Sequence, residues 1–192
     1  MVLAAVIVGF SAFGTYNGLV GEEERVDSAW ANVETAYQRR ADLIPNLVAT
    51  VQGASDFEQE TLTQVVEARA GATQATIEAT PEMLGNPAAF ARFQAAQDQL
   101  SSALSRLLLV VERYPELKAV AAYQDLMVQL EGTENRISVE RNRYNGAAQG
   151  FNTRIRRVPA AWLISIFGWD FGQKAYFTAE EGAQEAPDVS FD

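Results

Sequence analysis

A stripe of apolar residues at helical spacing runs along the first third of the chain. Its members follow one another at intervals of three or four residues, which places all of them on one face of an α-helix. The stripe consists of Val26, Trp30, Val33, Tyr37, Ala41, Ile44, Val48 and Val51. This pattern predicts a helix with one buried face that ends near Gly53. Pro45 lies inside it and is expected to kink the helix, because proline lacks the backbone N–H and clashes with the preceding turn.

Three further stretches show helical periodicity, and prolines or capping residues separate them. Proline either ends a helix or occupies its first position, and Ser55 to Glu58 have the spacing of a capping box. No stretch alternates between apolar and polar residues in the way that predicts a half-buried strand. Because short connections make neighbouring helices antiparallel, we expect an all-α fold, an antiparallel up-down four-helix bundle over residues 21–158. The four expected helices span about residues 22–53, 55–80, 87–114 and 115–158.

The chain begins with an apolar stretch in which Ser11 is the only polar side chain up to residue 14. Residues 1–20 are long enough for a transmembrane anchor, continuous with or leading into the first helix. A cleaved signal peptide and a buried core helix are the alternatives, although no basic residue precedes the stretch as a signal peptide requires. Arg25 follows it and favours a cytoplasmic bundle, with an extracytoplasmic one as the alternative. The Gly14-xxx-Gly18 spacing favours self-association of the anchor.

A second apolar stretch, residues 159–177, follows the fourth helix. It contains Trp162 and Trp169 and comes after three arginines, which are Arg154, Arg156 and Arg157. Basic side chains beside tryptophans are typical of an anchor at a membrane interface. An apolar run of this length is equally typical of a segment that caps the end of the bundle. Residues 178–192 form an acidic tail.

The antiparallel arrangement predicts which charges face each other, since both helices rise about 1.5 Å per residue. Basic residues of one long helix then lie level with acidic residues of the other, and we expect interhelical ion pairs. The same register places Arg154, Arg156 and Arg157 level with residues 13–16. The expected pairs are Arg39 and Arg40 with Glu131 and Glu134, Arg143 with Asp27, and Arg141 with Glu24 and Asp27.

Composition excludes several classes of function. The chain of 192 residues contains no cysteine and no histidine, so it offers no thiolate nucleophile, zinc ribbon or Ser-His-Asp triad. Its net charge of −10 is unfavourable for binding nucleic acid. It also lacks the glycine-rich loops that bind nucleotides. We therefore expect no catalytic residue, no cofactor, no metal site and no small-molecule substrate.

Two clusters of polar residues leave a choice between a site and a structural role. The first cluster could bind a hard cation and consists of Glu22, Glu23, Glu24 and Asp27. Its side chains point in different directions around the helix axis and do not converge, which favours a solvated turn at a helix N-terminus. The second cluster could bind an anion through Arg39 or Arg40, or form a charge-paired seam between helices, which we favour. Its residues are Gln38 to Asp42 with Glu131, Glu134 and Asn135.

These segments together resemble the LemA family over nearly the whole chain. The most specific block is Tyr37 to Val48, YQRRADLIPNLV, and the weakest zone is about 71–99. Further similar blocks are Thr61-Leu62, Glu67 to Ala70, Leu104 to Leu107, Glu112 to Lys118, Leu130 to Ile137, Arg143 to Asn145, Phe151 to Arg154, Tyr176-Phe177 and Pro187 to Val189. The resemblance implies a helical bundle behind one N-terminal membrane helix, with the bulk of the chain inside. Some relatives look like lipoproteins, but this chain lacks the cysteine that would carry the lipid.

The resemblance implies no reaction, although relatives at the magnetosome membrane suggest a part in organising membranes. We expect a non-enzymatic, membrane-anchored helical scaffold or adaptor. Its expected partners are the lipid membrane and either a second copy of the chain or another membrane protein. The alternatives are a membrane-tethered enzyme that uses carboxylates and a divalent cation, and an accessory subunit of another membrane complex.

Overall fold

All regular structure in the described part of the chain is helical. The computed structural model describes residues 2–53 and 58–178, with side chains described from residue 9 onward. The all-α class is therefore confirmed for these residues. The elements are α1 (Val2–Gln52), α2 (Gln59–Ile77), the 3-10 helix η1 (Pro81–Gly85), α3 (Pro87–Val111), α4 (Pro115–Lys118), α5 (Ala121–Arg156) and α6 (Ala160–Phe167).

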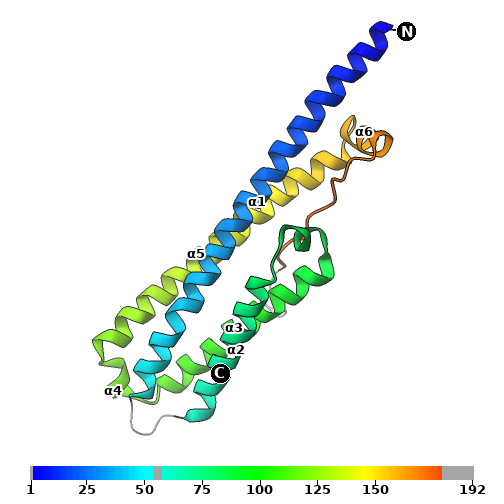
Figure 1. Ribbon diagram of the computed structural model, residues 1–192. Coiled ribbons are helices and arrows are strands. Elements are labelled where there is room, and N and C mark those ends of the chain that lie inside the picture. The colour runs from blue at the N-terminus through cyan, green and yellow to red at the C-terminus, as the bar shows by residue number, and fades with distance from the viewer. Residues whose placement is uncertain (1, 54–57, 179–192) are drawn as a thin grey trace, which may run out of the picture.

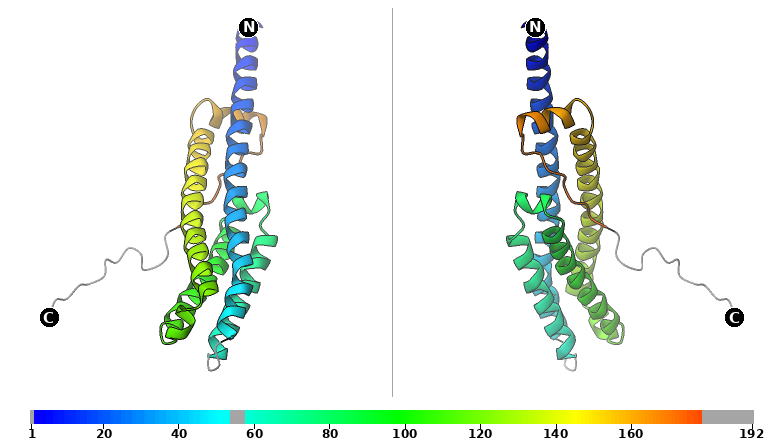
Figure 2. Two further views of the ribbon diagram at one scale, coloured as in Figure 1. Left: turned by 90° about the vertical axis from the view of Figure 1, so that its left-hand side faces the viewer. Right: turned by 90° about the vertical axis from the view of Figure 1, so that its right-hand side faces the viewer.

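Two antiparallel helix pairs make up the molecule. The long helices α1 and α5 form one pair, and the shorter α2 and α3 form a second pair that covers only the half far from the N-terminus (Figures 1 and 2). α1 packs closely on both α5 and α2, whereas α3 and α5 approach each other mainly through side chains. The predicted antiparallel up-down four-helix bundle is thus not confirmed, because the helices form two pairs of unequal length.

The predicted stripe is buried along its whole length. All eight residues from Val26 to Val51 belong to the core of the protein. The half of the core nearer to α6 is aromatic, because Trp30 contacts the rings of Phe93, Tyr144 and Phe177. The far half lies mainly between α1, α2 and α3 and is mostly aliphatic, with residues such as Leu62, Leu100 and Leu107.

Most predicted helix ends agree with the structure. α1 continues without interruption through Pro45 and ends directly before Gly53. The side chain of Asn86 caps α3 by accepting hydrogen bonds from the N–H groups of Ala88 and Ala89. Of the predicted capping box, Ser55 to Glu58, residues 55–57 lie outside the described residues. Glu58 itself makes no side-chain capping bond.

The predicted fourth helix, residues 115–158, is wrong in one respect. The chain forms the short helix α4, turns at Val120, and only then begins α5. This break lets Leu117 enter the aliphatic core, where it is buried. The side chain of Gln124 donates to the carbonyl of Lys118, which an unbroken helix would have paired internally (Nε2–O 2.8 Å).

The predicted anchor, residues 1–20, forms the first part of α1 and is continuous with the rest of that helix. Within the described residues, no helix carries an apolar run sufficient to cross a membrane. Much of the predicted span rests on residues 1–8, whose side chains lie outside that description. The transmembrane prediction is therefore not confirmed.

The apolar stretch 159–177 caps the end of the α1–α5 pair. Ala160 and Leu163 of α6 are buried, and the ring of Trp169 meets the ring of Tyr16 on α1, with centroids 5.0 Å apart. The chain leaves α6 at Gly168, whose positive φ of 65° suits glycine. Residues 169–178, named here the C-terminal segment, then run back between the two helix pairs without forming a helix (Figure 1).

Side chains of α5 and α3 hold the backbone of the C-terminal segment. Asn145 accepts from the N–H of Phe177 and donates to its carbonyl, at 2.9 and 3.0 Å. Asn152 makes the same pair of bonds with Lys174, both of 2.8 Å. Gln94 of α3 bonds the N–H and carbonyl of Thr178, at 3.2 and 3.1 Å. The segment therefore joins α5 to α3, beside the direct stacking of Tyr144 on Phe90.

We expect Asn145→Ala to lower the free energy of unfolding by about 1–3 kcal/mol, because it leaves the N–H and carbonyl of Phe177 without their partner. Urea unfolding followed by circular dichroism measures the change. Asn142→Ala is the matched control, since Asn142 lies exposed on the same helix. Equal stability of the two variants would show that the clamp on the segment contributes nothing.

Candidate functional site

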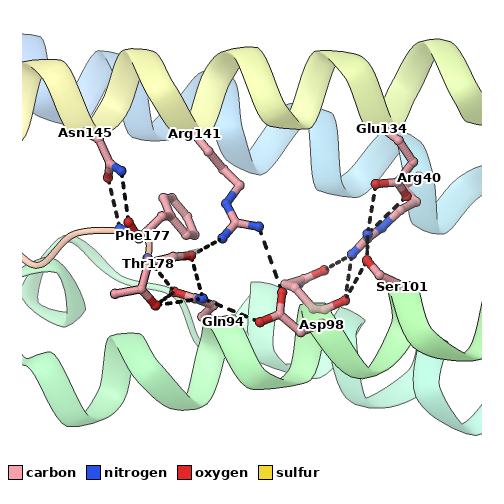
Figure 3. A network of polar contacts seen from close by, with 10 residues as sticks. Arg40, Gln94, Asp98, Ser101, Glu134, Arg141, Asn145, Phe177 and Thr178 are labelled. Carbon is pink, nitrogen blue, oxygen red and sulfur yellow. Dashed lines mark hydrogen bonds and ion pairs between the residues drawn. The ribbon is translucent and has the colours of Figure 1, made fainter. Parts of the chain in front are cut away.

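Arg40 is the centre of a buried polar network between α1, α3 and α5 (Figure 3). Its side chain is only 1% exposed. The guanidinium donates to Ser101 Oγ at 2.8 Å, to Gln97 Oε1 at 2.7 Å and to Glu134 Oε1 at 3.1 Å. Gln97 passes the network on to α2 by donating to the carbonyl of Ala72 at 3.0 Å. This arrangement joins four helices through one buried cation.

The network confirms one predicted ion pair and corrects the others. Arg40 pairs with Glu134 as expected, but its partners on α3 were not foreseen. Arg143 bonds Glu140 of its own helix at 2.8 Å instead of Asp27. Arg141 does not reach Glu24 or Asp27. Arg39 forms no ion pair within the described residues. The true register of α1 and α5 is displaced by about one helical turn from the predicted one, which is enough to exchange the partners.

A cavity of about 500 Å³ lies beside this network, between α1, α3, α5 and the C-terminal segment. Arg141 crosses it and donates to the carbonyl of Thr178 at 3.0 Å, with Asp98 at 3.9 Å (Figure 3). The lining contains two arginines and two acidic residues, so its formal charges cancel. The alternative of an anion site at Arg40 therefore lacks the surplus of positive charge that an anion requires, and the arrangement is the charge-paired seam that the sequence favours. Arg39 does not line this cavity.

Tyr37 lines the same cavity and is buried without a hydrogen-bond partner for its hydroxyl group. Burial raises its pKa from 10.0 to about 12, because the phenolate would lose its hydration. Arg141 and Arg40 oppose the shift, and Asp98 and Glu134 add to it. The hydroxyl is consequently neutral at physiological pH.

The acidic cluster at residues 22–27 does not form a metal site. These acids lie in the middle of α1, not at a helix N-terminus as the solvated-turn interpretation assumed. Glu22 pairs with Arg154 at 3.2 Å, and Glu23 with Lys174 at 2.6 Å. Burial raises the pKa of Asp27, while nearby Lys174 opposes the shift. In the described part of the chain, no three acidic side chains come together in a way that could hold a metal ion.

The end of the molecule nearest the N-terminus exposes large apolar side chains. On α1, Phe10 is 77% exposed, and Phe13 is also largely exposed. On α6, Trp162 and Ile166 are 65% and 74% exposed, and Phe167 is also exposed. These five residues are named here the apolar end. α6 is apolar on its exposed face as well as on its buried face, a pattern typical of helices that are covered by other protein or by lipid.

Gly14 and Gly18 do not share one free helix face. The guanidinium of Arg154 lies against Gly18, where a larger side chain would displace it. Gly14 faces open space. The small residue at position 18 thus leaves room for Arg154 of α5 to reach Glu22. Because Arg154 covers Gly18, the prediction that the Gly14-xxx-Gly18 face mediates self-association is not supported at Gly18.

We expect Arg40→Met to lower the free energy of unfolding by about 3 kcal/mol, because it strips Gln97, Ser101 and Glu134 of their common donor. Arg39→Met removes the same charge at the exposed neighbouring position and should change stability by less than about 0.5 kcal/mol. Urea unfolding compares the two variants. Equal effects would show that the network adds nothing beyond net charge.

Tyr37→Phe is expected to make unfolding less sensitive to alkaline pH. Between pH 10 and pH 12 the unfolded chain ionises Tyr37 while the native protein keeps it protonated, so native stability falls as pH rises through this range. The variant loses that contribution, about 2–3 kcal/mol over the range, and retains full stability at pH 7 because the removed hydroxyl has no partner. Urea unfolding of both proteins at several pH values measures the difference. Parallel pH curves would contradict the prediction.

Comparison with known proteins identifies the family. A model of the LemA family matches residues 29–191. Magnetosome protein MamQ 2 of Paramagnetospirillum magneticum is 29% identical over 189 residues, which cover 91% of this chain and 68% of that protein. Magnetosome protein MamQ of Magnetospirillum gryphiswaldense is 27% identical, over 99% of this chain and 76% of its own length. Protein LemA of Metamycoplasma hominis is 23% identical, over 80% and 65%. The chain belongs to the LemA family.

Proposed function

We propose that this protein is a non-catalytic scaffold that attaches to a membrane by its apolar end and holds its two helix pairs away from the lipid. The observation that carries the proposal is the apolar end itself, where α1 and α6 both present exposed rings. Charged side chains lie directly behind this end, such as those of the Arg154–Glu22 pair. The relatives designated magnetosome proteins support a setting at a membrane.

The attachment has two parts in this proposal. The first part of α1 inserts as an anchor, and α6 lies beside it at the level of the lipid headgroups. Trp162 and Phe167 suit this level, since amphipathic and aromatic rings gather at membrane interfaces. Three arginines at the same end favour a cytoplasmic position of the helix pairs, because basic residues beside an anchor are retained on that side. They are Arg154, Arg156 and Arg157.

We also propose that the scaffold associates with further copies of itself. Large apolar side chains remain exposed on the helix pairs away from the apolar end, among them Ile77, Leu109 and Val128. The mass of the particle extracted from native membranes in mild detergent tests this part. A particle that contains several copies of this chain alone supports it, whereas a stoichiometric second protein or a clean monomer contradicts it.

The position of α6 in the membrane can be tested by fluorescence quenching. In vesicles of lipids with brominated acyl chains, we expect strong quenching of the tryptophan emission. Trp162→Phe should remove most of the quenched component, because Trp162 is the tryptophan most exposed at the apolar end. Trp30→Phe is the matched control, since Trp30 is buried in the aromatic core far from lipid.

Quenching that survives Trp162→Phe unchanged would contradict the placement of α6. Failure of the unmodified protein to float with vesicles in a density gradient would overturn membrane attachment as a whole.

A further inference from the structure

A cavity of about 650 Å³ lies directly behind the apolar end, between α1, α5 and the start of α6. Its lining includes Thr15 and Glu22 of α1, Arg154 of α5, and Arg157 at the turn into α6. Two arginines and one glutamate give this lining a formal charge of +1, in a chain whose net charge is −10. The linings of four other cavities in the described part of the chain have a formal charge of zero or below.

Arg157 supplies the surplus charge. Glu22 lies 3.2 Å from Arg154 and neutralises it. Arg157, by contrast, has no side-chain or acidic partner for its guanidinium anywhere in the described residues, and it is exposed. The neighbouring Arg156 differs, since its Nε donates to the carbonyl of Asn152 at 3.1 Å and it does not line the cavity. A free guanidinium with five donors is the side chain best suited to bind phosphate oxygens.

Further donors surround this guanidinium. The hydroxyl groups of Thr15 and Thr153 and the amide group of Gln149 also belong to the lining, and all three can donate hydrogen bonds to a phosphate. Val158 and Pro159 form the apolar edge of the cavity, and Val158 is exposed. Trp162 follows within one turn of α6. The cavity is therefore polar within and apolar at the edge that adjoins the apolar end.

We propose that this cavity binds the phosphate group of an anionic phospholipid, with Arg157 as the principal ligand. The inference rests on the proposed membrane attachment and adds to it a lipid preference. The depth fits, because α6 lies at the level of the lipid headgroups in the proposed attachment, and the arginines directly behind it then lie at the level of the phosphates. The excess positive charge selects a lipid with net negative charge over a zwitterionic one, and an otherwise acidic protein is held at an anionic surface by this contact.

The test uses the full chain, equilibrated in mild detergent with equal amounts of phosphatidylglycerol and phosphatidylcholine and then examined by native mass spectrometry. The measured quantity is the ratio of retained phosphatidylglycerol to phosphatidylcholine. We expect a clear excess of phosphatidylglycerol on the unmodified protein. Arg157→Gln should lower the ratio about fivefold, as the loss of one cation near an anionic headgroup implies. Arg157→Lys should restore part of it, since the charge returns without the bidentate geometry.

Arg156→Gln is the decisive control. It removes the same charge at the neighbouring residue, and the side chain of Arg156 does not line the cavity. We expect its ratio to stay within twofold of the unmodified protein. Equal losses in Arg156→Gln and Arg157→Gln would overturn the site, because they would indicate diffuse attraction to charge alone. A ratio near one on the unmodified protein would also overturn it. Neither result bears on flotation with vesicles, so failure of the lipid site and failure of membrane attachment are distinguishable.

Discussion

The arrangement of the two helix pairs depends on the C-terminal segment that lies between them. Because this segment is not helical, its backbone N–H and carbonyl groups need partners that secondary structure does not provide. Asn145, Asn152 and Gln94 provide them, each with one donor and one acceptor. Phe177 then packs among Trp30, Phe90 and Tyr144 in the aromatic core. Side chains of α5 and α3 thus hold the same stretch of chain, and this adds to the direct stacking of Tyr144 on Phe90.

The molecule has two parts with different environments. Around Arg40, four helices and the C-terminal segment enclose a neutral polar seam, in which each charge has a partner. Toward the N-terminus, α2 and α3 no longer cover the long pair, and only α6 caps it (Figure 2). The exposed rings of Phe10 and Trp162 lie in this second part. Both long helices, α1 and α5, run through the two parts: Glu134 of α5 pairs with Arg40 in the first, and Arg154 of α5 pairs with Glu22 in the second.

The sequence predicts the helices better than the contacts between them. Burial of the stripe from Val26 to Val51 follows from periodicity alone, since spacing determines which face a residue occupies. Ion pairs between helices depend on register, and a displacement of about one turn leaves Arg143 without Asp27, so that Arg143 pairs with Glu140 of its own helix. The clamp of Asn145 on Phe177 joins residues 32 positions apart along the chain. No periodic pattern marks such a contact, although the polar residues Asn145 and Asn152 on an otherwise buried helix face were a signal that could have been used.

The same chemical group serves two purposes in this protein, and the difference lies in what surrounds it. The guanidinium of Arg40 is enclosed by acceptors from α3 and α5, so binding an anion there would require breaking bonds that hold the helices together. The guanidinium of Arg157 lies at the edge of a cavity whose one acid already pairs with Arg154. The sequence favoured a charge-paired seam at Arg39 and Arg40 over an anion site, and the bonds of Arg40 agree with that preference. A cation is available to a ligand only where the fold leaves it unpaired, and here that condition is met beside the apolar end.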